Sequence, residues 1–283
     1  MVCPRPLYPQ QALQPYSFKH IYQYSKINIY QSLKEGLLCN NYHVYNSATL
    51  QQGISINKYI SQTGRCSRRE ADKLIEQGRV LINNKTARKG NRVNPGDDVI
   101  VDGERIKSKR KEQTIIALHK PKGVTCTTDQ KDPSNIIDYI NYPKRIFPIG
   151  RLDKDSTGLI LLTNDGSIVN KILRLENHHD KEYVVTVDKI INQDFINQMA
   201  AGVPITKHKV TEECKVMQLN NITFKITLQQ GLNRQIRRMC QHLGYRVKKL
   251  KRIRIMNIKL KDIPEGRWRY LTKDELVKLR EHL

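Results

Sequence analysis

The run Leu159–Thr163, with the letters LILLT, limits the possible folds of this chain more than any other stretch. Four large apolar residues in a row, closed by the turn sequence NDG at 164–166, are typical of a buried β-strand. The loop that precedes this strand carries two acids, Asp153 and Asp155, although the chain is otherwise basic. We therefore predict a buried strand with an acidic loop directly before it.

Short strand-like and helix-like segments surround this strand from Thr114 to the C-terminus. The expected strands are 115–119, 159–163, 182–187, 223–228 and 252–258, and the expected helices are 168–173, 194–199, 234–242 and 272–282. Thr272 and Glu275 have the spacing of a capping box at the start of the last helix. Strands outnumber helices and their connections vary in length, which favours an α+β fold over a doubly wound parallel sheet.

A compact unit of about fifty residues is predicted from Ile54 to Ile106. Two short helices come first. The second has a capping box of Ser67 and Glu70 and ends near Gly78, and small strands joined by turn sequences follow. Four basic residues gather at the helix-loop-helix: Arg65, Arg68, Arg69 and Lys73. They are candidates for phosphate contacts, although a solvated basic face explains the same pattern.

Two segments differ from these domains in composition. Residues 1–53 contain seven of the thirteen tyrosines and one acid, Glu35, and are interpreted as a poorly structured leader or extension. An organelle-targeting segment is the alternative. Residues 107–113 form a charged linker, and the second domain spans residues 114–283.

The chain carries 50 Lys and Arg residues against 27 acids, a net charge of +23 at pH 7. An excess of this size predicts a polyanionic partner. Residues 214–261 contain thirteen Lys and Arg residues and no acid, and such a block repels itself unless something negative lies against it. No apolar run is long enough to cross a bilayer, so nucleic acid is favoured over a membrane. The six scattered cysteines, without a C-x-x-C pair, fit a reducing compartment.

The motifs of several enzyme classes are absent. The chain has no G-x-x-x-x-G-K-[ST], no G-x-G-x-x-G after a strand, no H-E-x-x-H and no zinc-deaminase C-x-x-C. Nucleotide hydrolysis, dinucleotide redox chemistry and attack by metal-bound water therefore lack their usual residues. What remains is the loop acid Asp153 with basic neighbours that keep it ionised. On its own, such an acid is more often a turn-capping residue than a catalyst.

Four blocks occur in a recognisable order: HKPKG at 119–123, GRLDKDSTGLILLTNDG at 150–166, KEYVVTV at 181–187 and GLNRQIRRMC at 231–240. Together they resemble the motifs of the RsuA branch of the pseudouridine synthase family. Residues 54–106 resemble the α-L RNA-binding motif that commonly precedes this catalytic domain. Within the branch, the core RQIR of the last block is similar to that of the F-type synthases of 23S ribosomal RNA.

The resemblance implies an α-L RNA-binding module followed by a catalytic domain with a mixed, mainly antiparallel sheet flanked by helices. It implies that a specific uridine of large-subunit (23S) ribosomal RNA is isomerised to pseudouridine, with no cofactor and no metal ion. Asp153 matches the catalytic aspartate, Tyr183 the tyrosine that stacks on the target base, and Arg237 the basic residue beside the aspartate. Without the resemblance, Tyr183 is an ordinary strand tyrosine and Arg237 one more phosphate contact.

The expected chemistry requires an ionised carboxylate, which attacks the sugar or the base or removes a sugar proton; the sequence leaves this choice open. A bidentate guanidinium of Arg237 beside Asp153 would oppose the cost of burying that charge. Asp155 has no match in the motif and is interpreted as a loop acid, and Lys120 and Pro121 as supports of the catalytic loop. The residues expected to bind RNA are Arg65, Arg68, Arg69, Lys73, Arg151, Arg234, Arg238, Lys248, Lys249 and Lys251.

The resemblance also implies a cytoplasmic monomer without a membrane partner. Two alternatives stay open. One is the same chemistry on small-subunit ribosomal RNA or a tRNA anticodon loop. The other is a non-catalytic protein of ribosome assembly that binds ribosomal RNA.

Overall fold

The computed structural model of this protein describes residues 53–107, 113–174 and 178–283. The expected leader and the expected charged linker therefore lie almost entirely outside the described residues. Two parts remain to be described, each by itself: an N-terminal module, residues 53–107, and a sheet domain that begins at residue 113. No helix of the described residues is both long and apolar enough to cross a membrane.

The N-terminal module packs two helices against short strands. Its elements are β1 (Ile54–Ser55), α2 (Ile56–Thr63), α3 (Arg68–Glu76), β2 (Val80–Ile82), β3 (Lys85–Thr86), β4 (Arg92–Val93), β5 (Val99–Val101) and β6 (Glu104–Ile106). Ser67 and Glu70 form the predicted capping box, and Gly78 adopts the left-handed conformation just after α3. Ile56, Ile60 and Ala71 are buried where the helices meet.

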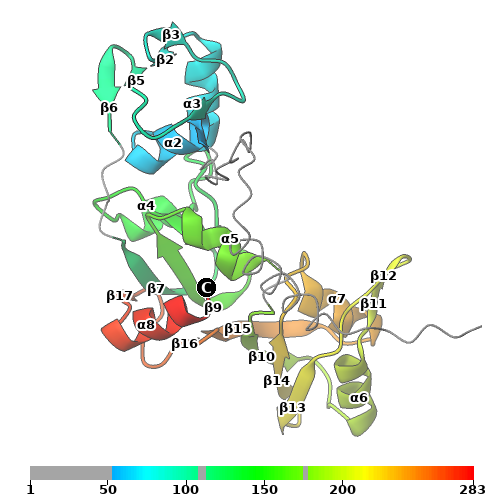
Figure 1. Cartoon of the computed structure of the whole chain (residues 1–283). Coiled ribbons are helices and arrows are strands. Elements are labelled where there is room, and N and C mark those ends of the chain that lie inside the picture. Colours follow the sequence, from blue (N-terminus) through cyan, green and yellow to red (C-terminus); the bar gives the residue numbers. More distant parts are fainter. Residues whose placement is uncertain (1–52, 108–112, 175–177) are drawn as a thin grey trace, which may run out of the picture. The chain divides into compact units, whose positions relative to one another are not determined.

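The sheet domain is built on one nine-stranded sheet, counted over its described residues. The strand order is β13-β14-β10-β15-β9-β7-β17, with β8 against β9 and β16 against β15 (Figure 1). Among the described strands of this sheet only the β15–β9 pair is parallel, so the prediction of a mixed, mainly antiparallel sheet is confirmed. The strands are β7 (Ile115–Lys120), β8 (Phe147–Ile149), β9 (Thr157–Thr163), β10 (Lys181–Val187), β13 (Lys215–Asn220), β14 (Thr223–Leu228), β15 (Val247–Ile255), β16 (Ile258–Lys259) and β17 (Trp268–Tyr270).

Strand β9 is buried on both faces, as its LILLT run predicts. Ile160 and Leu162 belong to a core that includes residues of α4, α6 and α7, whereas Leu159 and Leu161 belong to a second core with residues of α5 and α8. The sheet is therefore a central layer with helices on both faces, which confirms the α+β prediction. These helices are α4 (Ile136–Ile140), α5 (Ser167–Leu173), α6 (Gln193–Ala201), α7 (Gln235–His242) and α8 (Lys273–Glu281).

Three details of the sheet domain differ from the expectation. Strand β15 begins at Val247 rather than at residue 252, and a turn with Met256 in the left-handed conformation separates it from β16. The predicted helix 234–242 begins one residue later, because Arg234 is its left-handed N-cap. The short elements β8, β17 and α4 were not predicted, and neither were β13 and the hairpin of β11 (Pro204–Thr206) and β12 (Lys209–Val210). Strand β13 and the hairpin are largely exposed and lack the alternation that marks a half-buried strand.

Candidate active site

Asp153 lies in the loop between β8 and β9, directly before a strand that is buried from Gly158 to Thr163. The loop turns tightly, since the amide of Ser156 donates a hydrogen bond to the carbonyl oxygen of Asp153 at 3.0 Å. Ser156 is buried, whereas the Asp153 side chain is 29% exposed and Asp155 is exposed. The loop is thus anchored in the protein but leaves the Asp153 carboxylate accessible.

The segment after β7 holds this loop in place. The amide of Leu152 donates to Sγ of Cys126 at 3.3 Å, and the carbonyl of Lys154 accepts from the amide of Gly123 at 2.9 Å and from Nζ of Lys120 at 3.5 Å. Nζ of Lys120 also donates to two carbonyls of its own segment. Burial lowers the pKa of Lys120 and the negative charge of Asp153 opposes this. These contacts agree with the predicted role of Lys120 as a support.

Two guanidinium groups face one carboxylate oxygen of Asp153. Nε of Arg237 lies 3.6 Å and Nη1 of Arg234 lies 3.7 Å from Oδ2. No described residue donates a hydrogen bond to the other oxygen, Oδ1. Arg237 is the partner that the motif predicts, but Arg234 was expected among the RNA contacts. The two guanidinium groups thus place positive charge beside Oδ2, while Oδ1 has no donor among the described residues.

The expected bidentate Asp153–Arg237 pair is not formed. Nε of Arg237 is buried without a hydrogen-bond partner, while Nη2 donates to Oγ of Ser156 at 3.1 Å and to the carbonyl of Asp155 at 3.4 Å. Arg237 therefore faces the carboxylate electrostatically and fixes the turn that carries it. Arg237 lies on helix α7, whose preceding residue, Ile236, is buried in the core and so fixes the orientation of the helix.

Tyr183, Arg252 and Gly158 lie in one row across the sheet, on β10, β15 and β9. Tyr183 is 9% exposed and contributes to the core on the face that also contains Leu152 of the Asp153 loop. A Cβ at Gly158 would lie 2.2 Å from the carbonyl oxygen of Arg252, so only glycine permits this approach of β9 to β15. The row links the predicted tyrosine to the end of the Asp153 loop.

Arg252 was missed as a site residue. It is 4% exposed, and its Nε donates to the carbonyl of Leu159 at 2.7 Å and its Nη1 to the carbonyl of Arg151 at 3.5 Å. Its Nη2 is buried without a hydrogen-bond partner. One signal was available in the sequence. Leu250 and Arg252 are two positions apart in a strand, so their side chains point to the same face, and the apolar Leu250 indicates that this face is buried.

The residues predicted to contact RNA differ in their exposure and in whether an acid of the protein already pairs with their charge. Arg65 pairs with Asp102 and Glu104 of its own module, so its charge is already compensated. A β-bulge at Lys248, where the β10–β15 register skips a residue, leaves Lys248 and Lys249 both exposed. The other exposed members are Arg68, Arg69, Lys73, Arg151 and Arg234, while Arg238 and Lys251 are partly buried.

Comparisons with known proteins agree with this geometry. Residues 114–242 match the family described as RNA pseudouridylate synthase, and residues 55–99 match the S4 domain. The dual-specificity RNA pseudouridine synthase RluF of Escherichia coli (strain K12) is 58% identical over 227 residues, which cover 80% of this chain and 78% of RluF. The ribosomal large subunit pseudouridine synthase B of Bacillus subtilis (strain 168) is 35% identical over 233 residues, 80% of this chain and 95% of that protein.

Solved structures lead to the same family. A crystal structure of pseudouridylate synthase superposes with a TM-score of 0.60 at 29% identity, and the match covers 80% of this chain and 100% of that one. The N-terminal module thus matches the S4 domain, and the sheet domain matches the pseudouridylate synthase family.

Proposed function

This chain belongs to the RNA pseudouridine synthase family, and we propose that it isomerises a specific uridine of large-subunit (23S) ribosomal RNA to pseudouridine with Asp153 as the catalytic residue. The observation that carries the proposal is the Asp153 carboxylate, fixed in a loop and faced by Arg237 and Arg234. We assign residues 54–106 to an RNA-binding module and residues 114–283 to the catalytic domain, and the two family matches support this division.

The reaction is an isomerisation, so it consumes no reagent. The bond between N1 of uracil and C1′ of the ribose breaks, the base turns, and C5 bonds to C1′ while C5 loses a proton and N1 gains one. A carboxylate assists either as a nucleophile or as the base that takes a proton. Oδ1 of Asp153 has no described donor and is available for this step, while Oδ2 faces the two arginines.

We propose distinct roles for the residues around Asp153. Tyr183 stacks on the target base, supported by its place in the row that ends at the Asp153 loop. Arg237 stabilises the ionised Asp153 and fixes the turn through Ser156. Arg252 is a positioning residue, because it holds the loop by the carbonyl of Arg151 and does not contact Asp153 itself.

RNA must be bound and locally opened before this chemistry. A uridine in a base stack has to leave that stack before Asp153 can reach it, at a cost of a few kcal/mol. Phosphate contacts from the exposed lysines of β15, Lys248 and Lys249, together with Arg68, Arg69 and Lys73 of the module, offset that cost. We further propose that the enzyme acts as a monomer in the cytoplasm, where ribosomal RNA is modified.

The choice of substrate rests on the relatives and on one motif. Synthase B of B. subtilis is named for the large ribosomal subunit, and the RQIR core at 234–237 resembles that of the F-type synthases. The E. coli relative is named as dual-specificity, which favours a second RNA substrate as the next candidate function. A tRNA anticodon loop is the form of it that we would test first.

The test uses ribosomal RNA and tRNA from cells that lack the gene, treated with the full-length enzyme and mapped for pseudouridine. We expect the wild-type enzyme to modify a defined uridine in the large-subunit RNA. Asp153→Asn should abolish the product but retain RNA binding, whereas its loop neighbour Asp155→Asn should keep most of the activity. Conversion at the wild-type rate by Asp153→Asn would refute the catalytic assignment. Pseudouridine found only in small-subunit RNA or only in tRNA would show that this RNA, and not large-subunit RNA, is the substrate.

A further inference from the structure

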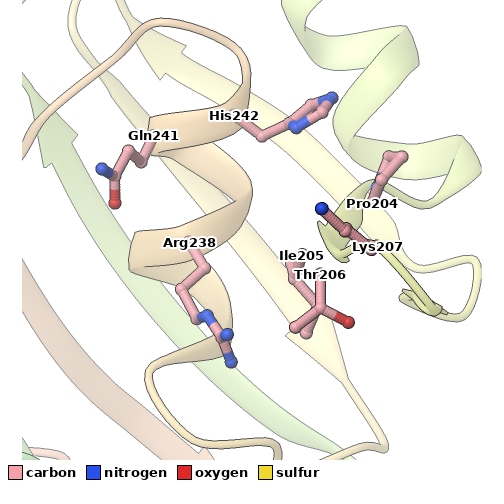
Figure 2. A pocket seen from close by; sticks show the side chains of 7 residues that line it. All are labelled: Pro204, Ile205, Thr206, Lys207, Arg238, Gln241 and His242. Atoms are coloured by element: carbon pink, nitrogen blue, oxygen red, sulfur yellow. The ribbon is translucent and has the colours of Figure 1, made fainter.

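A cavity outside the Asp153 site lies between α7 and the β11–β12 hairpin. Its volume is about 540 Å³, within the range of about 300–1,000 Å³ typical of small-molecule sites. Ile205 and Thr206 of β11 line it, and so do Arg238 and His242 of α7 (Figure 2). Apolar surface and hydrogen-bonding groups therefore occur together in one hollow.

The charge of the lining is one-sided. Lys207, Arg238 and His242 line the cavity, and none of its lining residues is an acid. In Figure 2 the side chain of Lys207 extends from the hairpin toward α7. Within the described residues, none of these three side chains takes part in an ion pair. The two cations among them, Lys207 and Arg238, attract an anion of matching size into the hollow.

Helix α7 connects this cavity to the proposed catalytic centre. Arg234 and Arg237, three residues apart, face Asp153, whereas Arg238 and His242, four residues apart, line the cavity. Arg238 and His242 share one side of α7, and Arg237, one position before Arg238, lies on the neighbouring side, while Arg234 is the residue that caps the helix. The two sites thus lie on neighbouring sides of one helix, whose diameter with side chains is about 10–12 Å. Since one strand advances about 3.4 Å per nucleotide, a strand with its uridine at Asp153 covers that distance within a few nucleotides.

We propose that this cavity binds a nucleotide of the substrate RNA that flanks the target uridine. Its phosphate lies between Lys207 and Arg238, and its ribose or base lies against Ile205. The inference rests on the proposed RNA-modifying function and deepens it, since it assigns a second contact point beside the reacting base. Such a contact fixes the position of the strand relative to Asp153.

The experiment follows two local signals in the full-length protein by NMR, the methyl groups of Ile205 and the ring of His242. The probes are a tetrauridylate and, separately, inorganic phosphate. We expect tetrauridylate to shift both signals to saturation, and phosphate to need a much higher concentration. Lys207→Glu should weaken tetrauridylate binding about tenfold, the loss of one charge-assisted contact. The matched control is Lys209→Glu, the same charge change on the same hairpin but outside the cavity, which should weaken it less than about twofold.

A steric variant tests the hollow without altering its charge. Thr206→Trp fills the cavity and should weaken tetrauridylate binding as Lys207→Glu does, in a protein whose thermal unfolding is unchanged. Any of three results would overturn the inference. The Ile205 and His242 signals stay unshifted, Lys207→Glu and Lys209→Glu lose the same affinity for tetrauridylate, or phosphate saturates the signals at the same concentration as tetrauridylate. Pseudouridine formation by the wild-type enzyme is measured separately. If pseudouridine forms while the cavity signals stay unshifted, only the cavity proposal fails. If no pseudouridine forms while the signals shift, the enzymatic proposal fails, and the cavity is an RNA-binding site but not a contact beside a reacting uridine.

Discussion

Replacing Arg237 by methionine should slow the chemical step far more than it weakens RNA binding. The Arg237 side chain is 14% exposed and makes two kinds of contact with the catalytic loop. Nε lies 3.6 Å from the Asp153 carboxylate, and Nη2 donates to Oγ of Ser156 at 3.1 Å. Methionine keeps much of the volume and removes both contacts, so the variant isolates their contribution.

The size of the effect follows from these distances. At the 3.6 Å separation of Arg237 and Asp153, two unit charges attract by about 4–5 kcal/mol in an effective dielectric of about 20. Desolvation of both groups and the partial exposure of Asp153 reduce this to about 1–2 kcal/mol. The charged hydrogen bond to Ser156 adds about 1.5–3 kcal/mol. A total of about 3 kcal/mol corresponds to a turnover lower by a factor on the order of 10².

The assay is a single-turnover rate at saturating RNA, measured beside the dissociation constant. Lys249→Met is the control, because Lys249 is exposed on β15 and should affect binding alone. Arg237→Lys should recover part of the rate, since an ammonium restores the charge but cannot reach both Asp153 and Ser156 in the same way. If Arg237→Met turns over within about twofold of wild type and loses only affinity, Arg237 is a phosphate contact and the reasoning fails.

Three further predictions concern residues around the sheet. Arg252→Met should lower turnover about tenfold with little change in KM, and Arg252→Lys should recover part of it; an unchanged rate in the folded protein would remove Arg252 from the positioning role. Arg269 lowers the pKa of Glu275 below its ordinary 4.5, so this carboxylate contributes stability above that pH and loses it as the pH falls through the lowered pKa. Glu275→Gln should therefore cost about 1–2 kcal/mol in thermal unfolding at neutral pH and nothing in strong acid; a pH-independent difference would exclude the ion pair. Lys249→Gln should flatten the salt dependence of RNA binding by up to about one unit of slope, and an unchanged slope would place Lys249 away from phosphates.

The parts of this protein that sequence reasoning found are those specified by neighbouring residues. The burial of β9 follows from five consecutive letters, and each capping box, such as Ser67 with Glu70, from residues three apart. Asp153 was placed in a loop before that strand by the same local reading. Strand β13 escaped because an edge strand with mostly exposed residues has no alternation for a pattern to detect.

The role of Arg252 escaped for a different reason. Its contacts are with the carbonyls of Leu159 and Arg151, 93 and 101 positions away in the chain, and they exist only because β15 pairs with β9 in parallel. A parallel pair of this kind is fixed by tertiary packing, which local sequence does not encode. Gly158 lies just before the predicted strand 159–163 and falls inside β9 only in the structure, where it permits the close approach of the β15 backbone.

The basic block at residues 214–261 shows how charge counting overstates RNA contacts. Of its thirteen Lys and Arg residues, Arg237 and Arg252 turn inward to the Asp153 loop, Arg234 also faces Asp153, and Arg254 pairs with Asp180 and Glu182. Nine cations of the block are therefore engaged by none of these contacts. Sequence reports the sign of a charge but not the direction in which the fold points it. In the proposed function the same block serves two purposes: its outer lysines attract the RNA, and its inner arginines place positive charge beside Asp153 and fix the loop that carries it.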